Sequence, residues 1–125
     1  MATDQGIALL NLTGGIARVV LGGAGSVMQP VGQALEVLPY KDVVLFLTCG
    51  FLGAANVTVR IWSGMRKDTD EGWVYVSAFA LVIAQNFEER VAFSGTTSFG
   101  RYIRYEVVFT GASELNFEIT GIGRP

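Results

Sequence analysis

Apolar and polar residues alternate with a period of two over several short stretches of the chain. The clearest stretches are 57–62 (VTVRIW), 101–110 (RYIRYEVVFT) and 115–120 (LNFEIT). Successive side chains of an extended chain point to opposite faces, so each stretch presents one apolar and one mixed face. The residues predicted to point inward are Val57, Val59, Ile61, Ile103, Tyr105, Val107, Phe109, Leu115, Phe117 and Ile119. This alternation predicts half-buried β-strands.

Seven strands are expected, with turn-like segments rich in glycine and polar residues between them. Their predicted ranges are 34–38, 42–49, 56–62, 73–83, 87–93, 101–110 and 115–122. The stretch 72–84 (GWVYVSAFALVIA) is apolar on both faces, which predicts a central or doubly covered strand. No window shows a convincing helical period. Short strands at roughly ten-residue spacing predict an all-β fold, an antiparallel β-sandwich or jelly roll over residues 36–125.

The first 35 residues differ from the rest, because they hold only two charges, Asp4 and Arg18, and two glycine clusters within 13–25 (TGGIARVVLGGAG). Disordered segments are usually polar and charged, and this one is apolar. We expect an N-terminal arm or edge strands over 1–35 that either complete the domain's own sheet or cover a neighbouring subunit. The predicted interface residues are Ile7, Leu9, Leu10, Ile16, Arg18, Val20, Met28, Met65, Arg66 and Lys67.

Arginines stand among aromatic rings in the segment 100–109 (GRYIRYEVVF). This arrangement is found in grooves that bind nucleic acid, where rings stack on bases. The period-two pattern favours an ordinary strand instead, with Arg104 and Glu106 on the face toward solvent or a partner. Each of these two charges is expected to pair with a neighbouring strand.

Composition narrows the possible functions. The chain has 125 residues, half of them hydrophobic and 16% charged, with a formal net charge of −2, so no nucleic-acid partner is expected. It has no histidine and one cysteine, Cys49, which excludes histidine-based triads, cysteine metal clusters and an intrachain disulfide. The adjacent carboxylates Glu88 and Glu89 would diverge on a strand. We therefore expect no enzymatic activity, no metal and no cofactor.

The most polar segment is 63–73 (SGMRKDTDEGW), a predicted hairpin tip. Asp68, Asp70 and Glu71 resemble part of a calcium loop, but Phe79 stands where the closing glutamate would be needed. Met65, Arg66 and Lys67 could equally form a contact patch. The ligand platform predicted as an alternative consists of Trp62, Trp73, Asp68 and Asp70.

The first residues (MATDQGIALL) lack the basic region of a secretory signal, and no uninterrupted apolar run is long enough to span a membrane. The expectation is a protein made in a reducing cytoplasm, without a membrane partner.

The segments VTVRIWSG and EGWVYVSAF, followed by GRYIRYEVVFTGASELNFEITGIGR, resemble small β-sandwich proteins of tailed-bacteriophage virions, such as auxiliary capsid (decoration or cement) proteins. The RYIRYEV strand also resembles discoidin-type jelly rolls. The resemblance covers about residues 36–124. The virion likeness implies a non-enzymatic capsid protein that bridges capsid subunits, contacts the major capsid protein or other virion subunits and forms a homo-oligomer, a trimer by analogy. Its location would be the virion. The discoidin likeness implies the alternative, a carbohydrate-binding module of a tail or host-recognition component.

Overall fold

The computed structural model describes residues 7–53, 56–79, 88–94 and 100–125, with only the backbone at 51, 52 and 88–94. The strands are β1 (Ala8–Asn11), β2 (Ala17–Leu21), β3 (Gly25–Met28), β4 (Leu35–Glu36), β5 (Asp42–Leu52), β6 (Val57–Gly64), β7 (Val74–Ala78), β8 (Glu88–Ser94), β9 (Tyr102–Phe109) and β10 (Ser113–Arg124). The only helical element in these ranges is a 3-10 turn, Val31–Gln33. The predicted all-β fold is confirmed.

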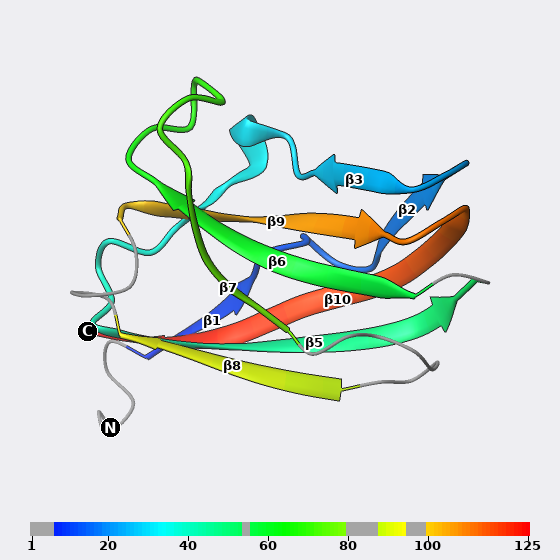
Figure 1. Ribbon diagram of the computed structural model, residues 1–125. Helices are drawn as coiled ribbons and strands as arrows, with labels where there is room; N and C mark the ends of the chain where they lie inside the picture. The colour runs from blue at the N-terminus through cyan, green and yellow to red at the C-terminus, as the bar shows by residue number, and fades with distance from the viewer. Residues whose placement is uncertain (1–6, 54–55, 80–87, 95–99) are drawn as a thin grey trace.

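The strands form two antiparallel sheets that face each other (Figure 1). Sheet A has the order β1, β10, β5, β8, and β2 also pairs with β10. Sheet B has the order β3, β9, β6, β7, and β4 also pairs with β9. β1 and β2 lie end to end along one edge of β10, since Leu9 pairs with Ile122 and Val20 with Glu114. β3 and β4 likewise share one edge of β9, so each sheet has four strand positions. Apart from β6 and β7, which are neighbours in sheet B, successive positions lie in opposite sheets, as in a jelly roll.

The hydrophobic core lies between the sheets and contains every residue that alternation predicted to point inward. Tyr105 of sheet B and Phe117 of sheet A meet there edge to face, with ring centroids 5.1 Å apart. Cys49 of β5 is fully buried, as its apolar neighbours predicted, and this burial raises the pKa of its thiol to about 11.

Strands β1, β2 and β3 come from the first 35 residues and belong to the sandwich itself. They pair with β10 and β9, and their segment contributes Leu10, Leu12 and Val19 to the core. In this structure the segment completes the sheets of its own chain.

Two strand predictions need correction. The strand expected at 34–38 is reduced to the two residues of β4, because the 3-10 turn precedes it. The strand expected at 73–83 to be central is β7, which ends at Ala78 and lies at the edge of sheet B. Residues 80–83 of that prediction lie outside the described residues. β7 has apolar side chains on both faces, but it is not a central strand. At the edge of the sheet its Val74 and Tyr75 side chains are exposed.

Candidate functional site

Large apolar side chains occupy the outer face of sheet A, which alternation turns away from the core. Leu9 is 89% exposed, Ile16 is 81% exposed, and Val20 and Phe46 are exposed as well. We define the outer patch as Ile7, Leu9, Ile16, Val20, Phe46 and Ile122. Five of the nine exposed large hydrophobic side chains of the described residues belong to it. Exposed apolar side chains that gather on one face are typical of surfaces that contact another molecule.

Two shallow hollows interrupt this face. The larger, of about 390 Å³, lies between Leu9, Phe46 and Ile122. The smaller, of about 130 Å³, lies beside Ile16 over Gly50, where the missing side chain leaves open space. The two hollows give this apolar face a relief of its own.

Three charged groups among the described side chains of this face, Arg18, Glu114 and Glu118, have near partners. Arg18 of β2 donates to Glu114 of β10 at 2.6 Å, and Asn11 donates to Glu118 at 3.3 Å. Arg18, Glu114 and Glu118 already have partners within the chain. A protein that covered the apolar side chains would therefore leave these pairs intact.

The predicted interface residues lie in four places: the outer face of sheet A, sheet B, the β6–β7 loop and the core. Ile7, Leu9, Ile16, Arg18 and Val20 lie together on the outer face of sheet A. Met28 lies on sheet B, and Met65, Arg66 and Lys67 lie in the β6–β7 loop. Leu10 was predicted wrongly, since it is buried in the core. Neighbours on a strand point to opposite faces, so only one of Leu9 and Leu10 can be at the surface.

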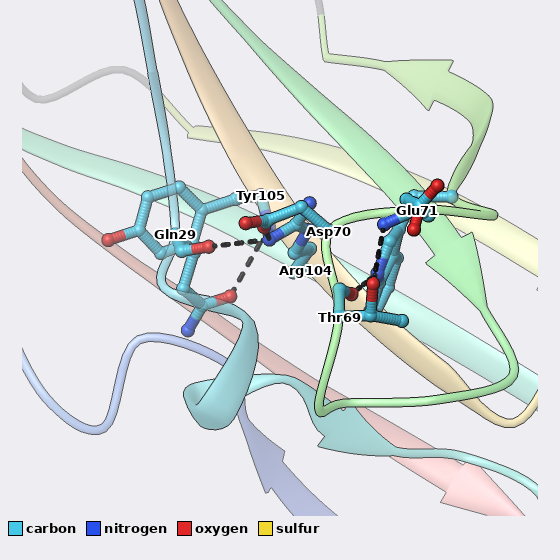
Figure 2. A network of polar contacts seen from close by, with 7 residues as sticks. Gln29, Thr69, Asp70, Glu71, Arg104 and Tyr105 are labelled. Atoms are coloured by element: carbon cyan, nitrogen blue, oxygen red, sulfur yellow. Dashed lines mark hydrogen bonds and ion pairs between the residues drawn. The ribbon is translucent and has the colours of Figure 1, made fainter.

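On sheet B, the β6–β7 loop covers a buried arginine (Figure 2). Only 4% of the Arg104 side chain is exposed; its Nη1 donates to Asp70 at 2.9 Å and to the Gln29 carbonyl at 3.2 Å. The Trp73 ring lies over the guanidinium, 4.5 Å from ring centroid to Cζ, while Nε has no partner among the described residues. Arg104 does lie on the face of β9 turned away from the core, but the expected pairing with a neighbouring strand is wrong. The loop folds back over it, and its carboxylate partner comes from that loop.

Trp73 is fixed by two further contacts. Its Nε1 donates to the Thr69 carbonyl at 2.9 Å, and its ring packs on Gly64, where a Cβ would lie 2.8 Å from Cδ2. Glycine at this position is what allows the ring to approach the backbone of β6. We define the clasp as the loop 65–73 closed over Arg104 through Asp70 and Trp73.

Gln29 connects the clasp to the edges of both sheets. Its buried amide donates to the Leu12 carbonyl at 2.7 Å, and its Oε1 accepts from the Tyr105 backbone at 3.3 Å. Its own carbonyl accepts from Arg104 (Figure 2). The Gln29 side chain thus satisfies backbone groups of two segments that are distant in sequence, at Leu12 and Tyr105.

Beside the clasp, the outer face of sheet B carries an aromatic cluster, defined as Arg60, Trp62, Tyr75 and Glu106. The Trp62 and Tyr75 rings meet edge to face at 5.9 Å, and Arg60 lies 5.8 Å from the Tyr75 ring centroid. Glu106 accepts from Trp62 at 3.0 Å and pairs with Arg60 at 3.6 Å. The cross-strand pairing expected for Glu106 is therefore present. A hollow of about 300 Å³ lies between the other three side chains.

The predicted ligand platform is only partly assembled. Trp62 lines the hollow, whereas Trp73 and Asp70 are engaged by Arg104. Asp68 accepts both guanidinium hydrogen bonds of Arg66, which lowers the pKa of that carboxyl. The structure supplies three residues that the sequence analysis did not select, Arg60, Tyr75 and Glu106. Each lies on an outward face of its strand, but only the pairing of β6 with β7 and β9 brings them together.

Within the described ranges, no group of three or more carboxylate or cysteine side chains is placed to hold a metal ion. In the same part of the chain, no helix is long and apolar enough to cross a membrane.

No protein-family model and no curated protein matches the chain. Among solved structures, a subunit from "Bacillus endospore appendages form a novel family of disulfide-linked pili" is similar over 95% of this chain and 89% of its own, at 14% identity and a TM-score of 0.54. At this identity the likeness shows the β-sandwich fold and nothing further.

Two other structures are more distant. PirA is 16% identical over 92% of this chain and 90% of its own, with a TM-score of 0.44. A Clostridium thermocellum xylanase 10B structure with CBM22-1 and GH10 modules is 10% identical over 94% of this chain and 26% of its own, with a TM-score of 0.42. These three structures include no phage capsid protein, so the virion assignment rests on the sequence resemblance.

Proposed function

We propose that this chain is a non-enzymatic structural subunit of a repeating protein assembly, a capsid-decoration protein of the kind that the sequence resemblance implies. It contacts its neighbours, copies of itself or other virion subunits, through the outer patch. The observation that carries the proposal is the collection of exposed apolar side chains on one face, Leu9 and Ile16 foremost. Burial of such side chains in a subunit contact stabilises the assembly by about 1.5–3 kcal/mol each.

The absence of suitable catalytic groups in the sequence supports a structural role. The chain has no histidine, and its one thiol is buried with a raised pKa, which disfavours the reactive thiolate.

The endospore appendage with a similar sandwich belongs to disulfide-linked pili. That protein illustrates one way in which such a sandwich serves in a fibre. Here the only cysteine, Cys49, is buried. Assembly of this chain would therefore rest on non-covalent contacts, and the outer patch supplies apolar surface for them.

The test is the solution mass by light scattering after gel filtration, over a range of protein concentrations. We expect the wild-type chain to be an oligomer and Leu9→Asp to weaken association by roughly 100-fold, because a charge replaces a contact of about 3 kcal/mol. The matched control is Leu38→Asp, since Leu38 is 61% exposed and lies outside the outer patch. A wild-type monomer at every concentration, or equal effects of the two variants, would contradict self-assembly through this face.

A further inference from the structure

We propose that the aromatic cluster of sheet B is a binding site for a neutral saccharide. It lies on the opposite sheet from the outer patch, so the proposal is independent of assembly through that patch. A saccharide unit has a flat C–H surface and a rim of hydroxyl groups. The cluster offers a complement to both.

The rings provide the apolar part of the site. Tyr75 stands on the edge strand β7 with 48% of its surface exposed, and Trp62 meets it edge to face across the hollow. The faces of aromatic rings carry negative electrostatic potential, which attracts the weakly positive C–H groups of a sugar. The volume of about 300 Å³ is at the lower end of ligand sites and suits one or two sugar units.

Arg60 and Glu106 provide the polar part. The contacts of Glu106 with Trp62 and with Arg60 both involve Oε1, so Oε2 has no partner among the described residues. In a side chain that is 12% exposed, Oε2 is left to accept from a sugar hydroxyl at the edge of the hollow. The Arg60 side chain is 42% exposed, and its guanidinium has further N–H groups to donate to an adjacent hydroxyl. Hydrogen bonds to ionised groups are stronger than those between neutral ones, so this pair can fix the orientation of vicinal hydroxyls.

The charge of the cluster selects the class of ligand. One arginine is paired with one carboxylate, so the site is close to neutral overall and gives little attraction to a phosphate or a carboxylate. The pairing also holds Trp62 and Arg60 in place before a ligand arrives, which lowers the entropy cost of binding. A neutral sugar fits these properties better than an anion does.

In the experiment the full chain is titrated with soluble cello-, xylo-, malto- and chito-oligosaccharides. Isothermal titration calorimetry and tryptophan fluorescence monitor the binding. We expect saturable binding of at least one series, with a fluorescence change because Trp62 lines the hollow. Tyr75→Ala and Glu106→Gln should each weaken binding by roughly tenfold or more, through loss of a ring contact and of a charged acceptor.

The matched control is Val74→Ala, the exposed neighbour of Tyr75, which should bind as the wild type does. Glu106→Gln keeps the shape of the side chain, so it tests the site even if Tyr75→Ala lowers stability. Absence of saturable binding by all four series would overturn the proposal, as would binding that both variants leave unchanged. Leu9→Asp should retain sugar binding whatever its oligomeric state, so failure of this site and failure of assembly are distinguishable.

Discussion

Arg104 is a buried charge with one carboxylate partner among the described residues. Its guanidinium is almost fully buried, yet the carboxylate that neutralises it, Asp70, is 80% exposed at the side chain. Removal of one member of a buried pair leaves an uncompensated charge, which costs more than the pair itself contributes. Water around Asp70 reduces this cost but does not remove it.

Asp70→Asn should therefore lower the free energy of unfolding by about 1.5–3 kcal/mol, the range for hydrogen bonds to charged groups. Asp68→Asn is the matched control, because Asp68 lies in the same loop but forms a solvent-exposed ion pair with Arg66. We expect that control to produce no measurable change. Urea denaturation followed by circular dichroism measures both, and equal stabilities of the two variants would show that Arg104 does not need Asp70.

Cys49 makes stability depend on pH in the alkaline range. Burial raises its pKa from 9.0 to about 11, so between these values the unfolded chain loses the thiol proton while the folded chain keeps it. The free energy of unfolding should fall across this window, by up to about 1.4 kcal/mol per pH unit. Burial raises the pKa of Tyr105 too, and its titration adds to the fall in the same direction.

Comparison of the wild type with Cys49→Ala isolates the effect of the thiol on stability, because Tyr105 is present in both proteins. The stability difference between wild type and variant, measured by urea unfolding, should shrink between about pH 8 and pH 10.5. Parallel pH profiles of the two proteins would mean that the thiol is not responsible.

At the scale of elements, the loop 65–73 keeps one closed arrangement through its contacts with β6 and β9. Trp73 packs on Gly64 of β6 and covers Arg104 of β9, while Asp70 pairs with that arginine. The loop also carries Arg66 and Lys67, both exposed and both sites for trypsin. Proteolysis therefore reports directly on whether the clasp is closed.

Gly64→Ala should open the clasp, because the new Cβ would lie 2.8 Å from the Trp73 ring and displace it. We expect faster tryptic cleavage after Arg66 or Lys67 and a changed tryptophan emission spectrum. Gly50→Ala is the control, since nothing lies within 4 Å of a Cβ at that position of β5. Cleavage at the wild-type rate in Gly64→Ala would show that Trp73 adjusts without opening the loop.

Strand positions and inward residues followed from the sequence because alternation with a period of two is a local signal. Val57 and Phe117, for example, are buried as predicted. The edge position of β7 did not follow, since it depends on pairing between segments distant in the chain. The burial of Arg104 did not follow either, because its partner Asp70 lies 34 residues away and reaches it only after the loop folds back.

The candidate sites could likewise be predicted from the sequence only in part. The exposed apolar positions Leu9 and Ile16 could be identified in the first 35 residues as soon as these were considered as interface strands. The aromatic cluster could not be assembled in advance, although Trp62 was selected. Its other members, Arg60, Tyr75 and Glu106, become neighbours only through the register of three strands.

At the scale of the whole molecule, the sandwich depends on its first strands. The segment up to residue 35 contributes Leu10, Leu12 and Val19 to the core and Gln29 to the polar junction between the sheets. A chain that lacks residues 1–35 should therefore show no cooperative unfolding transition, because several buried side chains and the edges of β9 and β10 lose their partners. Circular dichroism with urea denaturation tests this, and a folded truncated chain would contradict it.

The pairing of β1 with β10 brings the two ends of the described chain together, with Ala8 opposite Gly123. A short linker can therefore join them without disturbing either sheet, and new termini can be opened elsewhere in a circularly permuted protein. A peptide or fluorescent domain fused directly before Ile7 or after Arg124 would emerge from the same pole of the sandwich. Two such fusions on one subunit would therefore be displayed side by side.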